Sequence, residues 1–176
     1  MKNSFNNLSP LDGRYSKYTS ELSNYFSEAA LIKVRFEIEI DWLLFVLLDK
    51  FFNTPKLSNA SKKKLLQFKA SFSSKSVTEI KKIESKTNHD VKAVEYYIKK
   101  YLKKDSKLKK YIPYIHLGLT SEDINSLSYA LMINNGKNVV ANKLKELKMQ
   151  LRKLATQNKN VAFLARTHGQ PASPST

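Results

Sequence analysis

The three histidines of this chain lie in three short polar segments, residues 87–90, 115–123 and 165–170. Each segment also carries hydroxyl, amide or acidic side chains and borders a stretch with helical periodicity. Histidine is the side chain whose ordinary pKa, about 6.5, allows proton transfer near neutral pH. A single histidine is usually structural, but three in such segments, with none elsewhere, indicate a site that binds polar groups or moves protons.

The first two segments are expected to precede helices. A helix N-terminus presents unpaired amide N–H groups and a partial positive charge, so it favours carboxylates and phosphates. Helix capping is the competing interpretation, with Asn88 or Asp90 in the first segment and a capping box of Thr120 with Asp123 in the second. Taken alone, each segment favours capping.

The third segment, residues 165–170, follows the apolar stretch Val161–Leu164, which we expect to be extended and buried. Gly169 would let the backbone bend or approach a ligand closely, which makes His168 a candidate proton donor or acceptor. Near the N-terminus, Pro10 and the Asp-Gly pair in residues 9–15 favour a turn. Arg14 and Tyr15 would then project from an ordered loop as a cation and a hydroxyl, although Arg14 could equally form a surface salt bridge.

The elements that position these segments are predicted to be helices, because apolar residues recur at intervals of three and four. The predicted helices cover approximately residues 20–52, 58–72, 76–86, 91–104 and 120–158, with a basic connector at 106–113. Asn134–Gly136 could break the last helix, but a single glycine costs only about 1 kcal/mol. Ser173-Pro174 resembles a helix start that the chain does not continue, which suggests a fragment. No strand alternation or internal repeat is evident, so the predicted class is all-α.

Composition restricts the function classes. The net charge of +16, from 31 basic and 15 acidic residues, would suit a basic helical nucleic-acid-binding module, which remains an alternative. However, all but four of the basic residues are lysines, and runs such as 62–64 and 99–100 fall on the expected solvent face of helices. Proteins that grip phosphates tend to use arginine. We therefore favour a solvated lysine surface over a nucleic-acid partner.

Several other classes are poor fits. There is no cysteine, which excludes disulfides and thiolate metal sites, and no two histidines are three or four residues apart. No Gly-rich phosphate loop is present. The longest apolar run, Trp42–Leu48, is too short to span a membrane, and the N-terminus lacks a signal peptide's apolar core. We expect a cytoplasmic protein without a metal, a cofactor or a membrane partner.

Four motifs together resemble the adenylosuccinate lyase family, in its order and spacing. They are residues 9–15, 87–96, 120–125 and 166–172, so the resemblance covers the chain from residue 9. The long Asn-His-Asp motif is similar to that of the bacterial branch. The wider superfamily, which includes fumarase, aspartase and argininosuccinate lyase, shares the fold. Another lyase of this superfamily, such as argininosuccinate lyase, is the alternative that the Asn-His-Asp segment argues against.

The resemblance implies elimination of fumarate from adenylosuccinate, giving AMP, and from succinylated aminoimidazole carboxamide ribotide in purine biosynthesis. It also implies a homotetramer of the full-length enzyme. The chain would hold an N-terminal helical domain, residues 1–109, and the truncated start of a central bundle of long helices, residues 110–176. The loop that supplies the catalytic base would lie beyond Thr176, so the chain alone is expected to be inactive.

The resemblance also implies residue roles. His168 matches the catalytic histidine and is assigned as the general acid for the leaving nitrogen. His116 matches a position near the site and is assigned a supporting role. The expected substrate-binding residues are Arg14, Tyr15, Asn88, His89, Asp90, Thr120 and Ser121.

Overall fold

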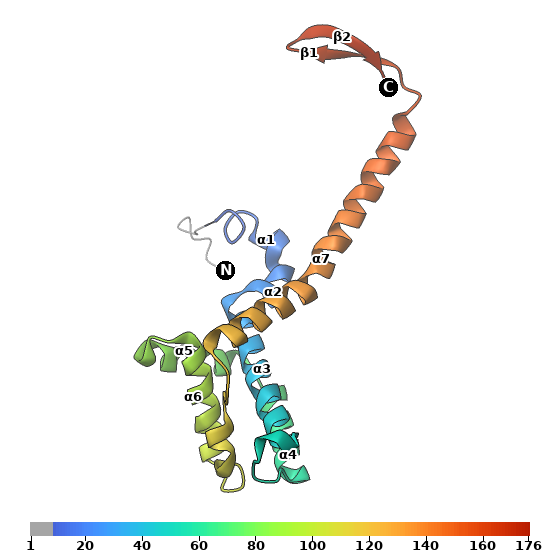
Figure 1. Ribbon diagram of the computed structural model, residues 1–176. Coiled ribbons are helices and arrows are strands. Elements are labelled where there is room, and N and C mark those ends of the chain that lie inside the picture. Colours follow the sequence, from blue (N-terminus) through green and yellow to red (C-terminus); the bar gives the residue numbers. More distant parts are fainter. Residues whose placement is uncertain (1–8) are drawn as a thin grey trace. The chain divides into compact units, whose positions relative to one another are not determined.

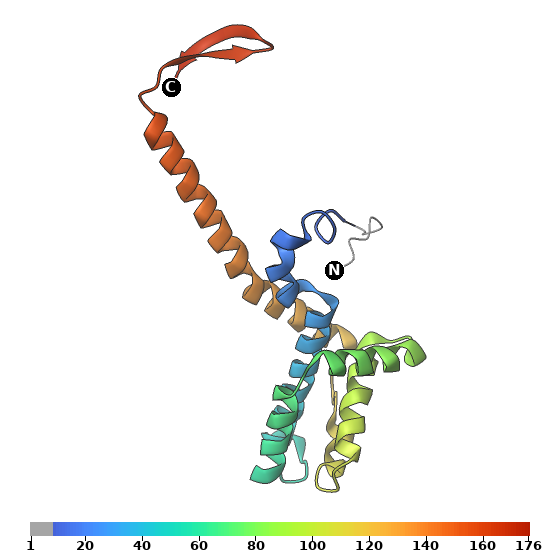
Figure 2. The same ribbon diagram turned by 180° about the vertical axis from the view of Figure 1, so that it is seen from behind.

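The computed structural model describes residues 9–176, and Figures 1 and 2 show its elements from opposite sides. The chain divides into two compact units, Met1–Gly136 and Lys137–Thr176. The elements in order are α1 (Ser16–Thr19), η1 (Ser20–Leu22), α2 (Ser23–Phe26), α3 (Glu28–Leu48), η2 (Lys50–Phe52), α4 (Asn59–Ala70), α5 (Ser74–Thr87), α6 (Asp90–Lys103), η3 (Lys109–Tyr114), α7 (Ser121–Asn158), β1 (Phe163–Thr167) and β2 (Gln170–Ser175), where η marks a 3-10 helix.

The all-α class is confirmed, with one small sheet as an exception. The helices predicted at 58–72, 76–86, 91–104 and 120–158 correspond to α4, α5, α6 and α7. The single helix predicted over residues 20–52 is wrong. Ser27 is extended, at φ −72° and ψ 161°, and its side chain accepts a hydrogen bond from the Ala30 amide, so a new helix begins at Glu28.

The core of the first unit forms around α3, which contacts α4, α5, α6 and η3. Phe36 is fully buried, and its ring lies 5.0 Å from the ring of Phe68 on α4. Phe68 in turn stacks on Tyr101 of α6, with ring centroids 3.6 Å apart. Burial of each large apolar side chain contributes about 1.5–3 kcal/mol. The predicted basic connector also joins this core, because Tyr111 of η3 is buried and its hydroxyl donates to the Lys56 carbonyl at 3.0 Å.

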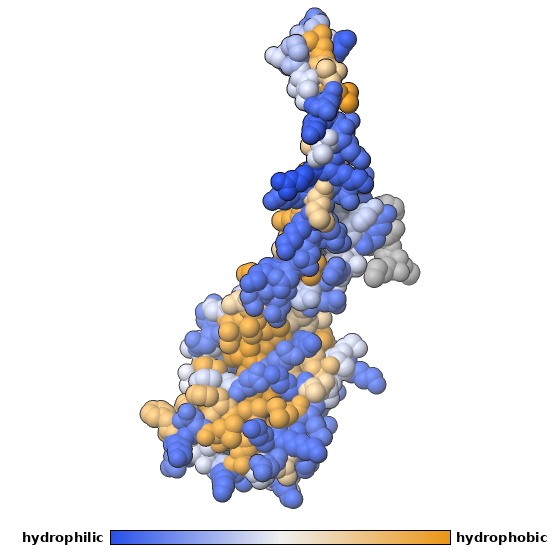
Figure 3. Space-filling model, turned by 90° about the vertical axis from the view of Figure 1, so that its right-hand side faces the viewer, coloured by the Kyte–Doolittle hydropathy of each residue, from blue (hydrophilic) through white to orange (hydrophobic). Residues whose placement is uncertain are grey.

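Apolar side chains also reach the surface of the described helical unit, where Figure 3 shows orange patches between hydrophilic residues. Near the end of α3, the rings of Trp42 and Phe45 lie 5.3 Å apart, and Phe52 of η2 contacts both. Phe45 is 48% exposed.

Within residues 9–176, no helix is long and apolar enough to cross a membrane.

Helix α7 runs through Gly136 without a break, as predicted. The buried residues of α7 recur every fourth position: Ile124, Ser128, Met132 and Gly136. A Cβ atom at Gly136 would lie 2.5 Å from the Phe26 ring, so glycine at this position permits a close approach of α2 to α7. From Val140 onward the large apolar side chains of the helix are exposed, with Leu144 and Leu151 each more than half accessible.

The end of the chain forms a β-hairpin, which corrects two predictions. β1 and β2 pair antiparallel, with Phe163 opposite Ser175 and Thr167 opposite Gln170. His168 and Gly169 both have positive φ angles, 52° and 77°, as the two central residues of a tight hairpin turn require. The expected helix start at Ser173-Pro174 is therefore wrong, because these residues lie in β2.

The expected burial of Val161–Leu164 is also wrong. Phe163 is 54% exposed and Leu164 is 50% exposed. A two-stranded hairpin has two free edges and no second layer of its own, so its apolar side chains stay accessible in the Lys137–Thr176 unit.

Candidate functional site

The first candidate segment joins α5 to α6 through an abrupt change of backbone direction. Asn88 adopts the left-handed conformation, φ 48°, and its amide donates to the Glu84 carbonyl at 2.8 Å, which ends α5. His89 is the N-cap of α6, since its Nδ1 accepts from the Lys92 amide at 3.3 Å. The expected N-cap of α6, Asn88 or Asp90, is therefore wrong, and Asn88 is instead the C-cap of α5. Asp90 is the first residue of α6 and accepts from the Val91 amide at 2.8 Å.

Arg35 links this segment to the start of α7. Its side chain is only 6% exposed, and one terminal nitrogen lies 2.7 Å from a carboxylate oxygen of Asp90. Its Nε donates to the side-chain oxygen of Asn125, in the first turns of α7, at 3.0 Å. Burial alone would raise the pKa of Asp90, but the Val91 amide and the Arg35 guanidinium lower it overall. Arg35 thus holds the N-terminal turns of α6 and α7 on α3.

The start of α7 carries the predicted capping box. The Thr120 amide and hydroxyl donate to one carboxylate oxygen of Asp123 at 2.6 and 2.8 Å, and the Asp123 amide donates back to the hydroxyl at 3.4 Å. The hydrogen bonds from Thr120 hold the pKa of Asp123 below its ordinary value. Ser121 is the first residue of α7. A carboxylate ligand that binds Thr120 would have to compete with Asp123.

His116 lies just before this helix and contacts a buried carboxylate. Its Nδ1 is 2.6 Å from Oε1 of Glu39, whose side chain is completely buried, and its Nε2 is 3.9 Å from Oε1 of Glu95. Glu95 is itself paired with Lys92, at 2.8 Å. Burial raises the pKa of Glu39 above its ordinary value, although the His116 ring acts in the opposite direction. His116 also has a positive φ angle, 59°, which is uncommon for a residue with a side chain.

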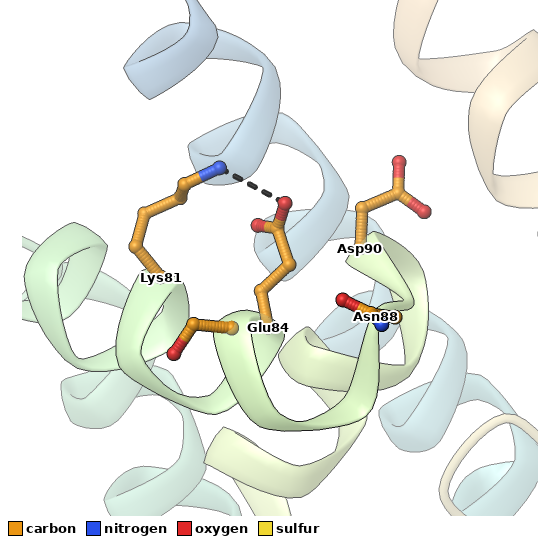
Figure 4. Close-up of a pocket in the computed structure, with 5 residues that line it drawn as sticks. Lys81, Glu84, Asn88 and Asp90 are labelled. Atoms are coloured by element: carbon orange, nitrogen blue, oxygen red, sulfur yellow. Dashed lines mark hydrogen bonds and ion pairs between the residues drawn. The ribbon is translucent and has the colours of Figure 1, made fainter.

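A polar pocket of about 480 Å³ lies beside the start of α6 (Figure 4). Asn88 and Asp90 line it together with Lys81, Glu84 and Ser85 of α5. The Lys81 ammonium is 2.9 Å from Glu84 and 2.7 Å from Glu28, so its charge is already paired with two carboxylates. The structure therefore places two of the predicted substrate-binding residues, Asn88 and Asp90, at one polar pocket.

The N-terminal turn and the third histidine lie apart from this network in the chain. In the turn, the Gly13 amide donates to the Ser9 carbonyl at 3.1 Å, and Arg14 and Tyr15 are both exposed. The Arg14 guanidinium lies 5.3 Å from the centre of the Tyr15 ring. His168 is exposed at the tip of the hairpin, in the Lys137–Thr176 unit, whereas the other candidate residues belong to Met1–Gly136.

Sequence reasoning missed four residues of the buried polar network: Arg35, Glu39, Glu95 and Asn125. Glu95 and Asn125 lie within the motifs at residues 87–96 and 120–125, although no role was assigned to them. Arg35 and Glu39 had a separate signal. Arg35 and Glu39 are four residues apart, on a helical face that otherwise carries buried apolar residues such as Phe36 and Ile40. A buried charge is costly without a partner, so two of them in an apolar stripe indicate a specific polar contact elsewhere in the chain.

Comparison with known proteins agrees with this arrangement of motifs. The sequence pattern of a family described as "Lyase" matches residues 13–176. Similar curated proteins named adenylosuccinate lyase come from Legionella pneumophila (strain Corby), 43% identical over 97% of this chain, from Haemophilus influenzae, 41% identical over 96%, and from Escherichia coli (strain K12), 40% identical over 96%. The chain spans about 38% of the length of each of these relatives. Because the family pattern matches residues 13–176, nearly the whole chain, the chain belongs to the lyase family.

Proposed function

We propose that this chain is part of an adenylosuccinate lyase. The complete enzyme would eliminate fumarate from adenylosuccinate, giving AMP, and from succinylated aminoimidazole carboxamide ribotide. The observation that carries the proposal is the identity of about 40% to relatives of that name over nearly the whole chain. The Asn-His-Asp segment at residues 88–90 favours this enzyme over argininosuccinate lyase, and its Asn88 and Asp90 line a polar pocket.

The reaction breaks one C–N bond. A base removes a proton from the carbon beside a carboxylate, the electron pair forms the C=C bond of fumarate, and the nitrogen leaves with the proton that an acid supplies. We assign His168 as that acid. Its place at the tip of a hairpin leaves the imidazole exposed and able to meet a substrate. Well-placed acid–base catalysis contributes about 10²–10⁴-fold.

The proposed substrates carry a phosphate and two carboxylates, and the first unit offers suitable groups for anions. The N-termini of α6 and α7 carry partial positive charge, and Arg35 fixes both of them. We assign substrate binding to Asn88, His89 and Asp90 at the first, and to Thr120 and Ser121 at the second. Arg14 and Tyr15, which are exposed on their turn, are assigned to the nucleotide, and His116 is assigned a supporting role.

Three wider assignments belong to the same proposal. The base-bearing loop is expected in a part of the enzyme that these 176 residues do not contain. The complete enzyme is expected to be a homotetramer in the cytoplasm, with small molecules and no nucleic acid as its other partners. The boundary between the N-terminal domain and the central bundle is placed near residue 109.

A substrate panel tests the proposal. The complete enzyme that contains this chain is incubated with adenylosuccinate, succinylated aminoimidazole carboxamide ribotide, argininosuccinate and aspartate, and the release of fumarate is measured. We expect release from the first two compounds alone. Fumarate release from argininosuccinate, without release from adenylosuccinate, would assign the enzyme to another branch of the superfamily and overturn the proposal.

A further inference from the structure

Glu39 is a buried carboxylate whose single polar contact among residues 9–176 is a histidine ring. Its side chain is fully inaccessible on α3, and Oε1 lies 2.6 Å from Nδ1 of His116, 77 residues further along the chain. Within the described residues, Oε2 has no hydrogen-bond partner. A buried carboxylate with one unsatisfied oxygen is costly, so its contact with His116 is weak evidence for stabilisation and calls for a specific explanation.

The contact belongs to a stripe of α3 that holds the connection into α7. Arg35, Glu39 and Trp42 follow one another at helical spacing on α3. They contact three points of this connection: Arg35 reaches Asn125 at 3.0 Å, Glu39 reaches His116, and the Trp42 Nε1–H donates to the Leu117 carbonyl at 2.9 Å. The stripe thereby supports His116 in its left-handed conformation immediately before the capping box of α7.

The geometry also distinguishes the two ring nitrogens of His116. Burial raises the pKa of Glu39, and the His116 ring opposes that shift. When Glu39 is ionised it can only accept hydrogen bonds, and Nδ1 of His116 then carries the hydrogen of their 2.6 Å contact. Nε2 is 3.9 Å from Glu95, which is beyond hydrogen-bond range. Both oxygens of Glu95 already accept from the Lys92 ammonium, at 2.8 and 3.0 Å. Among the described residues, Nε2 is thus the ring nitrogen without a hydrogen bond to a carboxylate.

We propose that Glu39 is a positioning residue for His116. It accepts the Nδ1 hydrogen, fixes the orientation of the ring, and leaves Nε2 as the nitrogen available to a bound group. The tautomer of His116 depends only on contacts within this chain, so it does not depend on the proposed function. Its consequence for turnover rests on the proposed function, because it requires His116 to support the lyase site.

The first test measures the tautomer in the 176-residue chain. Long-range ¹H–¹⁵N correlation spectra identify which imidazole nitrogen carries a hydrogen, because the other resonates far downfield when the ring is neutral. A His116→Gln variant assigns the signals. In the wild type we expect hydrogen on Nδ1, and in Glu39→Met a shift to the Nε2–H form or a mixture. Glu39→Gln should keep the wild-type form, since its amide oxygen can still accept. An Nε2–H form in the wild-type chain would overturn the proposal without any variant.

The second test uses the complete enzyme. Loss of a histidine's carboxylate partner at metal sites lowers activity by about 10–100-fold, and we expect Glu39→Met to lower kcat by a similar factor. In a His116→Ala background the same substitution should have little further effect, because Glu39 acts through His116. The control is Glu37→Met on the same helix, where Glu37 has a partly exposed side chain and lies 3.8 Å from Lys33. It should keep wild-type kcat.

The two tests fail separately. An inactive wild-type enzyme with the Nδ1–H form of His116 would count against the proposed function and leave the role of Glu39 in the chain supported. An active enzyme in which Glu39→Met lowers kcat equally with and without His116 would overturn the positioning role and leave the lyase activity in place.

Discussion

The Arg35 guanidinium lies 2.7 Å from the Asp90 carboxylate, and this contact holds the first turn of α6 on α3. The two partners are in different environments, because the Arg35 side chain is 6% exposed and that of Asp90 is 47% exposed. Removal of Arg35 would leave a carboxylate that water can reach, whereas removal of Asp90 would leave a buried cation with Asn125 alone. The pair is therefore asymmetric, and its two halves give different predictions.

Arg35→Met should destabilise the chain by about 1–3 kcal/mol, since it removes charge-assisted hydrogen bonds from a mostly buried position. Urea unfolding of the 176-residue chain measures this loss. Lys33→Met on the same helix is the matched control. Its ammonium is mostly exposed and lies 3.8 Å from Glu37, so we expect a change within about 0.5 kcal/mol. Equal losses for the two variants would show that Arg35 does not hold the helices together.

Asp90→Asn should make the stability of the chain less dependent on acid pH. The folded-state pKa of Asp90 is lowered, so its ionised form stabilises the fold above the unfolded value of 3.8, and this contribution is lost as the pH falls through the lower folded-state value. The variant should be less stable than the wild type at neutral pH, and the difference should vanish in stronger acid. Unfolding free energies over a pH series provide the measurement. A gap that stays constant far below pH 3.8 would contradict the ion pair.

Gly136→Ala should change the stability of the chain through two opposing effects, and the Phe26 ring decides which of them is larger. Alanine favours the helix by about 1 kcal/mol over glycine, but its Cβ would lie 2.5 Å from the Phe26 ring. We expect the substitution to stabilise the chain in a Phe26→Ala background and to be clearly less favourable in the wild type. Thermal unfolding of the four proteins of this cycle gives the coupling. Identical effects in both backgrounds would mean that the ring moves aside at no cost.

Helices α4 to α7 could be predicted from apolar residues that recur at intervals of three and four, whereas the break at Ser27 before α3 could not. The capping box of Thr120 with Asp123 was also predictable, since it depends on residues three apart. The hairpin could not be predicted, because its turn depends on positive φ angles at His168 and Gly169, and residues 168–169 lack the Asn-Gly or Asp-Gly pair that marks such turns.

The contacts within the candidate site could not be read from local spacing. Arg35 meets Asn125 over a separation of 90 residues, and Glu39 meets His116 over 77. The sequence marks the buried charges on α3 as unusual, but their partners depend on how α3, α6 and the connection to α7 pack together. Motif resemblance predicts that His116 lies near the site, whereas its contact with Glu39 depends on the fold.

Arg14→Ala in the complete enzyme should raise the KM for adenylosuccinate more than it lowers kcat. Arg14 is exposed on an ordered turn, and a charge-assisted hydrogen bond to an anion contributes about 1.5–3 kcal/mol, which corresponds to about 10–150-fold in affinity. Steady-state kinetics measure both constants. Lys17→Ala, a nearby exposed cation on α1, is the control and should leave KM unchanged. An unaltered KM in the Arg14 variant would identify it as an ordinary surface residue.

The most direct measurement compares fumarate release from adenylosuccinate by the complete enzyme and by its His168→Ala variant, with substrate binding measured separately by calorimetry. If His168 is the acid that protonates the leaving nitrogen, kcat should fall by about 10²–10⁴-fold while the substrate still binds. A variant that releases fumarate at nearly the wild-type rate would contradict the assignment, and with it the account of how this chain contributes to the reaction.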